Sequence, residues 1–271
     1  EAFLRQSANG DAAKNALRED LVTGEMLFRA PLLLGGQAAK AGLSCQSCHV
    51  NGLGNPHFQF AAISGEPGTA DTTHSFFSKT LGNQVFDPVP IPDLTQPGKV
   101  DHDPKTGALE AFITNIVVED FSGSGEISEV IGPLAAYVRA LQLSNVPADV
   151  ERRPRSLPTD LAILILTAEQ ARKRWDTGER RVAALLLSSA QSQLKTIHER
   201  MMPGDHTPQR AWLVARSREA GAMRRALDTG KDVAPLAIKE WSSAMQRYRG
   251  FADVEPQTLY NPDVLARALG R

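Results

Sequence analysis

The chain has 271 residues, of which 42% are hydrophobic and 23% charged, and its formal net charge at pH 7 is −1. This composition is typical of a soluble globular protein with one large domain or two ordinary ones. The near-neutral balance argues against nucleic-acid binding. We expect no membrane span, because the longest apolar run, residues 161–166, is far shorter than the roughly 18 residues that one needs.

The charge is unevenly distributed along the chain. Residues 1–145 hold nine Lys or Arg against sixteen Asp or Glu, whereas residues 146–271 hold twenty-one against fifteen. This asymmetry predicts two domains that attract one another within the chain. The alternative is that the basic half offers a docking surface to an acidic partner.

The first predicted helix covers residues 12–29, with Gly24 and Phe28 on one face. The chain then reaches Cys45-Gln46-Ser47-Cys48-His49, a C-x-x-C-H sequence, which is the attachment motif of a c-type haem. On a short helix, residues three and four apart share a face, so both thiols reach the haem vinyl groups while the imidazole points at the iron. The motif predicts one covalent haem c held by Cys45 and Cys48, with His49 as an iron ligand.

Two other chemistries use paired cysteines. A zinc site needs a second pair of ligands at comparable spacing, and the chain has no cysteine besides Cys45 and Cys48. A thioredoxin-like redox dithiol normally lies within a βαβ unit, and no alternating strand pattern surrounds this motif. Haem attachment is therefore the stronger interpretation, and no structural disulfide is expected beside it.

The ligand opposite His49 decides whether the predicted haem carries electrons or reacts with small molecules. Methionine is the usual ligand of electron carriers, but the sequence has no Met between Met26 and Met201. Either the position is open or one of three histidines fills it: His57, His74 or His102. His102 is the first choice, since it lies in a polar loop before a helix predicted over residues 108–118, and a neighbouring carboxylate is expected to fix its tautomer. The alternative is a solvent-exposed loop histidine.

The other candidates for this ligand are weaker. His74 precedes Phe76 and Phe77, which suggests a pocket wall, and His57 follows the motif so closely that it is expected to stay on the proximal side. A structural or surface role is the stronger prediction for both. A Met of the second half, at 201 or 202, is more typical of core packing than of ligation across domains.

The last helix of the first half is predicted over residues 131–141, with Pro133 near its start. Gly-x-x-x-Phe before the haem motif and Leu134, Tyr137 and Leu141 in this helix together resemble the class of small cytochromes c. The resemblance implies that a glycine lets the first and last helices cross closely, beside an aromatic residue from each.

A narrower resemblance is to a haem domain of the bacterial di-haem cytochrome c peroxidase and MauG superfamily. The run from Gly24 to Pro31 and the Gly42-Leu43-Ser44 lead into Cys45 are similar to that family. Two later segments look like degenerate family segments: Ile91-Pro92-Asp93-Leu94 and Leu109-Glu110-Ala111-Phe112-Ile113. The resemblance covers residues 15–145. The chain has a single C-x-x-C-H, so the family's second haem and its self-contained peroxidase chemistry are not expected.

The second half is predicted to be helical after a linker, residues 146–158, that holds three prolines. The predicted helices cover residues 159–176, 179–202, 208–228 and 235–249, and a short tail helix follows Asn261-Pro262. In the second of them, one stripe is typical of a bundle core: Val182, Leu185, Leu186, Ser189, Ile197 and Met201. The three tryptophans are expected in the core, with electron hopping as the alternative role.

Together these features predict an all-α protein in which a mono-haem cytochrome c-like domain (residues 1–145) precedes an antiparallel helical bundle (residues 159–271). The resemblance to c-type cytochromes implies a periplasmic protein whose signal peptide has been removed. The predicted function is electron transfer to a redox partner protein, with the helical domain docking the partner or forming a homo-oligomer. The alternatives are a peroxidase-like haem enzyme with an open distal side and an external electron donor, or a haem-based gas sensor.

Overall fold

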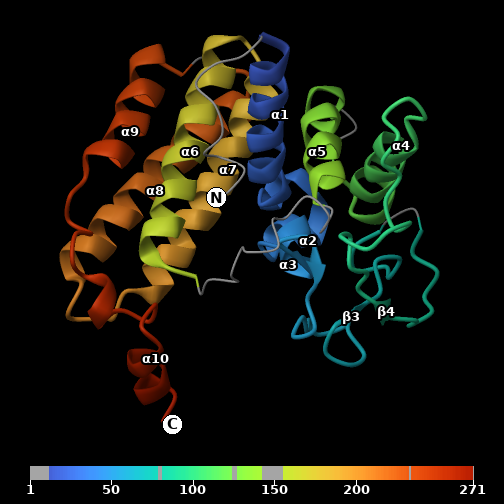
Figure 1. Cartoon of the computed structure of the whole chain (residues 1–271), viewed down its shortest axis with the longest axis horizontal. Helices are drawn as coiled ribbons and strands as arrows, with labels where there is room; N and C mark the ends of the chain where they lie inside the picture. The colour runs from blue at the N-terminus through green and yellow to red at the C-terminus, as the bar shows by residue number, and fades with distance from the viewer. Residues whose placement is uncertain (1–11, 79–80, 124–126, 142–154, 232, 271) are drawn as a thin grey trace.

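The computed structural model describes residues 12–78, 81–123, 127–141, 155–231 and 233–270, and it is mostly helical (Figure 1). The helices are α1 (Ala12–Phe28), η2 (Pro31–Leu33), α2 (Gly36–Lys40), α3 (Cys45–Cys48), α4 (Ala108–Asn115), η3 (Ile116–Asp120), α5 (Ser128–Ala140), α6 (Leu157–Asp176), α7 (Arg180–Arg200), α8 (Thr207–Asp228), α9 (Pro235–Arg247), η5 (Glu255–Gln257) and α10 (Pro262–Ala268). The all-α prediction is confirmed. No helix in the described ranges is long and apolar enough to cross a membrane.

Within the described residues, four very short strands form two antiparallel pairs that the sequence did not predict. In one pair, β1 (His49–Val50) joins β2 (Leu53–Gly54), and in the other β3 (Thr69–Ala70) joins β4 (Val89–Pro90). Each strand has two residues, too few for the alternation of polar and apolar residues to become visible in a sequence.

Helices α1 and α5 cross closely at Gly24, as the resemblance to small cytochromes c implies. A Cβ atom at Gly24 would lie 2.0 Å from the carbonyl oxygen of Pro133 and 2.7 Å from the Cβ of Tyr137, so only glycine allows this approach. Beside the crossing, the rings of Phe28 and Tyr137 meet edge to face at 5.4 Å. The prediction for the start of α5 is wrong: the helix begins at Ser128, which places Pro133 inside it. Proline there removes one helical hydrogen bond, and this local loss does not stop the helix from forming.

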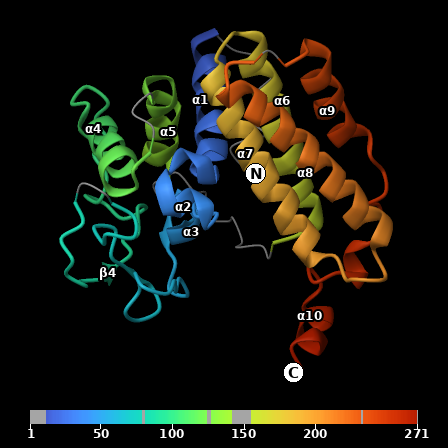
Figure 2. The ribbon, with the colours of Figure 1, turned by 180° about the vertical axis from the view of Figure 1, so that it is seen from behind.

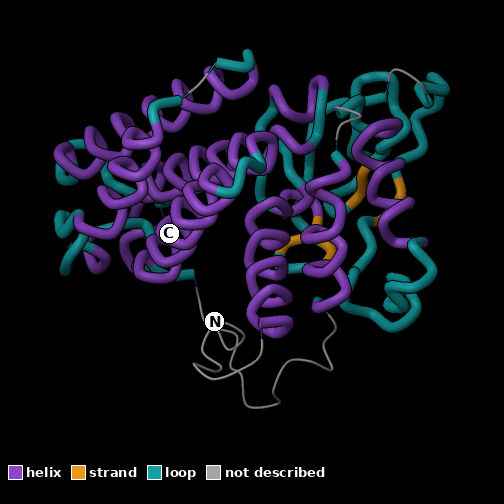
Figure 3. The backbone as a smooth tube through the Cα atoms, turned by 90° about the horizontal axis from the view of Figure 1, so that it is seen from above, coloured by secondary structure: helices purple, strands orange, loops and turns teal. Residues whose placement is uncertain are grey.

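In the second half, α7 packs along α6 on one side and along α8 on the other, and α9 lies against α6 (Figure 1). Figure 3, coloured by secondary structure, shows the short strands on the opposite side of the molecule from the C-terminus. The stripe predicted for α7 is buried: Val182, Leu185, Leu186, Ser189, Ile197 and Met201. Its other side is buried as well, at residues such as Ala183 and Leu187, because α1, α5 and η2 pack there. Residues 182–190 of α7 are therefore buried all round, whereas the C-terminal part of the helix keeps a partly exposed polar face.

One continuous core therefore joins the two halves of the chain. Polar contacts between α1 and α6 have the charge pattern that the sequence predicted, with acids from the first half and bases from the second. Lys173 Nζ lies 2.7 Å from a carboxylate oxygen of Glu19, and an Nη atom of Arg174 lies 3.2 Å from Asp20. These pairs are partly exposed, so each contributes at most about 1 kcal/mol to stability.

The predicted linker mostly lies outside the described residues, which resume at Arg155. Its predicted end at residue 158 is wrong, because α6 begins at Leu157 with Pro158 in its first turn and Ser156 as the capping residue. Proline suits that position, where the missing N–H would have no helical partner.

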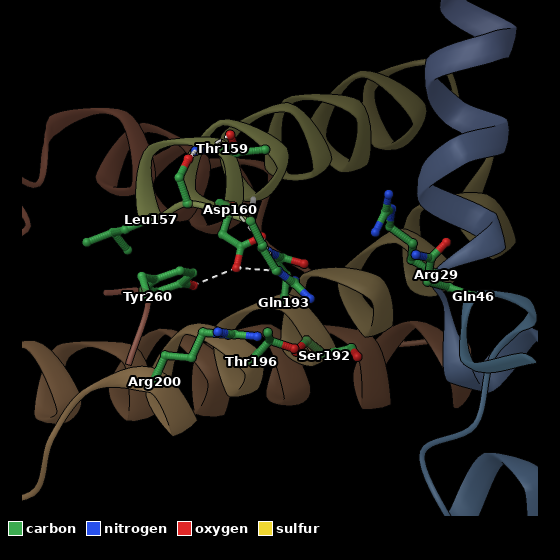
Figure 4. A network of polar contacts seen from close by, with 12 residues as sticks. Arg29, Gln46, Leu157, Thr159, Asp160, Ser192, Gln193, Thr196, Arg200 and Tyr260 are labelled. Atoms are coloured by element: carbon green, nitrogen blue, oxygen red, sulfur yellow. Dashed lines mark hydrogen bonds and ion pairs between the residues drawn. The ribbon is translucent and has the colours of Figure 1, made fainter. Parts of the chain in front are cut away.

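A buried polar network ties the C-terminal segment to the start of α6 (Figure 4). The Tyr260 hydroxyl lies 2.5 Å from a carboxylate oxygen of Asp160, which is 1% exposed. Arg155 Nε lies 2.8 Å from the same carboxylate, and the Gln193 amide donates to the Asp160 backbone carbonyl. Beyond this tether α10 extends away from the other helices (Figures 1 and 2).

Candidate functional site

The Cys45–Cys48 segment forms a single helical turn, α3, that begins at a reciprocal cap. The Ser44 amide donates to the Ser47 hydroxyl at 3.0 Å, and the Ser44 side chain in turn accepts from the Ser47 amide. The His49 amide closes the turn by donating to the Cys45 carbonyl. The turn places both sulfur atoms and the imidazole within five consecutive residues, and neither cysteine forms a disulfide.

The hairpin that follows the motif orients His49. Nδ1 of His49 lies 3.0 Å from the carbonyl oxygen of Pro92, so Nδ1 carries the proton and donates. The Leu94 amide donates to the Gly52 carbonyl and holds the Pro92 segment beside the hairpin. Burial lowers the pKa of His49, partly offset by the Pro92 hydrogen bond, which leaves the ring neutral at neutral pH. A neutral ring with Nδ1 engaged keeps an Nε2 lone pair for a metal ion.

Burial keeps the two thiols of the motif protonated. It raises the pKa of Cys45 to about 12 and that of Cys48 to about 11. A redox dithiol needs a lowered pKa, because the thiolate is the reactive species. The described residues contain no cluster of three or more His, Cys, Asp or Glu side chains that could hold a metal ion.

Polar side chains next to the motif hydrogen-bond to its exposed side, and no sequence pattern predicted these contacts. The Gln46 amide donates to the Asn51 side chain at 3.2 Å and accepts from the Asn51 backbone amide, also at 3.2 Å. Asn51 adopts a positive φ of 55°, which asparagine tolerates better than most residues. Asn55 donates to the Ser47 carbonyl at 2.9 Å. These contacts fix the turn between α3 and β2.

The aromatic pair at the α1–α5 crossing reaches the motif. The Phe28 ring lies 6.5 Å from the His49 imidazole, measured between ring centres, and it also meets Tyr137. Burial raises the pKa of Tyr137 above its ordinary range, so its hydroxyl stays protonated. The structure thus brings together four residues that were singled out separately in the sequence: Gly24, Phe28, His49 and Tyr137.

His102 is buried at its ring nitrogens, so the exposed-loop alternative is wrong. Neither Nδ1 nor Nε2 has a hydrogen-bond partner among the described residues. The expectation that a neighbouring carboxylate fixes its tautomer is also wrong. The Asp101 carboxylate instead accepts from the Thr106 hydroxyl at 2.5 Å and from the Asp103 amide at 2.9 Å, which lowers the pKa of Asp101.

An imidazole in this state is costly without a ligand. A buried polar group left without a partner costs about 1 to 3 kcal/mol, and His102 presents two.

The remaining candidate ligands have local roles. Nδ1 of His74 accepts from the Phe76 amide at 3.1 Å and so caps a turn, and His57 is exposed. Met201 is 1% exposed within the core of the second half. The Met202 amide donates to His206 at 3.1 Å at the end of α7.

Two of the three tryptophans lie in the core, as predicted. Trp175 and Trp241 are buried, and Trp241 donates from its ring nitrogen to the Arg216 carbonyl at 2.9 Å. Trp212 is half-buried against the core, where it stacks on Tyr248 with 4.2 Å between ring centres.

Comparison with models of protein families, with curated proteins and with solved structures finds no match.

Proposed function

We propose that Cys45 and Cys48 hold one covalent haem c, with His49 as an iron ligand, and that the chain is an electron-transfer protein. The observation that carries the proposal is the His49 geometry within the C-x-x-C-H motif: Nδ1 is engaged by Pro92 and the ring is neutral. The raised thiol pKa values do not fit a redox dithiol, which needs a lowered thiol pKa. A zinc site needs a second pair of ligands at comparable spacing, and Cys45 and Cys48 are the two cysteines of the sequence. The haem supplies a reversible one-electron couple when bound.

His102 is proposed as the second iron ligand. Its two buried, unpartnered ring nitrogens support this assignment, because ligation satisfies one of them without a contribution from the rest of the chain. The fixed loop around Asp101 holds the backbone of His102 in place through its contacts with Thr106 and Asp103. Two histidine ligands leave no open position for peroxide or a gas, which favours an electron carrier over a peroxidase or a sensor.

The proposed domain is similar to small cytochromes c in its helix crossing. Gly24, Phe28 and Tyr137 meet as that class implies, and His49 lies beside Phe28. We further propose export to the periplasm, where c-type haem is attached, and a helical bundle in residues 159–271 that docks a redox partner or a second copy. The apolar surface shared by α1, η2 and α7 supports a bundle that holds the haem domain firmly.

The test is to produce the chain in a host that attaches c-type haem and to record optical spectra of both redox states, with and without carbon monoxide or peroxide. We expect a low-spin six-coordinate spectrum that neither ligand changes. The His102→Ala variant should become high-spin in the ferric state and bind carbon monoxide when reduced. The exposed His57→Ala variant is the matched control and should behave as the unsubstituted chain. A high-spin spectrum that responds to peroxide in the unsubstituted chain contradicts the carrier and supports a peroxidase.

A further inference from the structure

A cleft of about 490 Å³ opens where η2 and α2 of the first half meet α7 and α8 of the second. Pro31, Leu32 and Gly42 line its near wall, and Gly42 stands just before the haem motif. The volume lies within the range of small-molecule sites. None of the proposed haem ligands lines this cleft, so it is a separate feature.

The far wall of the cleft is polar and basic. Helix α7 contributes residues spaced three or four apart, which places them on one face: Ser188, Gln191, Ser192, Lys195 and His198. Helix α8 adds Ser217, Arg218 and Arg224. Among the described residues that line the cleft there is no Asp or Glu.

A second cleft of about 310 Å³ continues along the same two helices. The two clefts share His198 and Val214, so together they form one groove. Pro203, Gly204 and Ala211 make this second part mostly apolar. Arg210 lines it too, and its guanidinium donates to the carbonyls of His198 and Met201 at 2.9 and 2.7 Å. The groove thus has a basic end and an apolar end.

The positive charge of the groove is only partly neutralised. Lys195 pairs with Glu199 at 3.6 Å, and Arg224 pairs with Asp228 at 2.5 Å. Arg218 is exposed and has no hydrogen-bond or ion-pair partner in the described part of the chain. A guanidinium in this state is suited to binding a carboxylate through two parallel hydrogen bonds.

We propose that this groove binds an amphiphilic organic anion, with its carboxylate at Arg218 and Lys195 and its hydrocarbon chain along Val214 toward Pro203. The basic end of the groove would pair with the carboxylate of the ligand, and the apolar end would cover its hydrocarbon chain. An acidic peptide is the other anionic occupant to consider. The modest volume of each cleft favours a small molecule over a peptide.

Octanoate is the probe, and isothermal titration on the full haem-loaded chain measures its binding. We expect saturable binding of one octanoate, and weaker binding of succinate, whose two carboxylates are joined by only two methylene groups. Arg218→Gln should lower octanoate affinity about tenfold, because it removes the charge-assisted contact to the carboxylate. Arg267→Gln, at an exposed arginine of α10, is the matched control and should leave affinity unchanged.

Three results overturn the proposal. The first is that octanoate shows no saturable binding, and the second is that the Arg218→Gln and Arg267→Gln variants bind it equally. The third is that a hexapeptide of glutamate binds more tightly than octanoate, which would assign the groove to an acidic peptide. Circular dichroism of each variant shows that it is folded. None of these measurements depends on the ligand opposite His49.

Discussion

Gly24→Ala tests the helix crossing that places Phe28 beside the haem motif. In the interior of an unconstrained helix this change stabilises by about 1 kcal/mol. Here the new methyl group would lie 2.0 Å from the Pro133 carbonyl oxygen, whereas carbon and oxygen atoms approach to roughly 3.3 Å. The obstacle is backbone, so the helices must separate by more than about 1 Å, and such overpacking costs about 1 to 3 kcal/mol or more. We expect a net destabilisation of about 2 kcal/mol.

Urea unfolding followed by far-ultraviolet circular dichroism measures this change from the midpoint at constant slope. Gly132→Ala is the control: Gly132 lies in α5, and apart from its two chain neighbours a Cβ atom there meets nothing within 4 Å. Alanine favours the helix, whereas a Cβ before Pro133 disfavours it, so the control should change stability by less than about 1 kcal/mol. If Gly24→Ala is no less stable than this control, the close crossing of α1 and α5 is refuted.

Three further predictions concern the core and its tethers. Tyr260→Phe removes the hydrogen bond to buried Asp160 and should lower the free energy of chemical unfolding by about 1 to 3 kcal/mol. An unchanged free energy would show that this hydrogen bond does not tether the C-terminal segment. Burial, followed by the Asp160 contact, raises the pKa of Tyr260 above its ordinary 10.0, so stability should fall as pH rises above 10.0, because the unfolded chain releases this proton first. Tyr260→Phe should make that decline shallower, with Tyr137 among the groups that still contribute to it. Leu186→Ala should lower the free energy of unfolding by about 2 to 5 kcal/mol. Because one core joins the two halves, unfolding curves recorded by haem absorbance and by circular dichroism should coincide, and two separate transitions would contradict a shared core.

The helices were predictable because their signals are local. Apolar residues recur at the helical period, and Gly178, Pro203 and Gly230 mark breaks between helices of the second half. Helix α7 shows the limit of this reasoning. Its predicted stripe is buried, but the burial of its remaining apolar residues could not be predicted, because it depends on α1 and η2 packing against them. Packing between distant segments leaves no period in a sequence.

The residues of the C-x-x-C-H motif were predictable from the sequence, but the groups that orient them were not. Cys45, Cys48 and His49 are recognised by their spacing, whereas the Pro92 carbonyl is a backbone acceptor 43 residues away that carries no side-chain signal. His102 was chosen from its place in the chain. The burial of its nitrogens, and the use of Asp101 by Thr106 instead, depend on how the loop folds.

Intact-mass measurement after acid extraction of unbound haem tests whether Cys45 and Cys48 hold a covalent haem. A chain matured in a c-type haem host should retain the mass of one haem. The Cys45→Ala, Cys48→Ala double variant should retain none under the same extraction. An unsubstituted chain that leaves the extraction at the mass of its polypeptide alone would show that the motif holds no covalent haem.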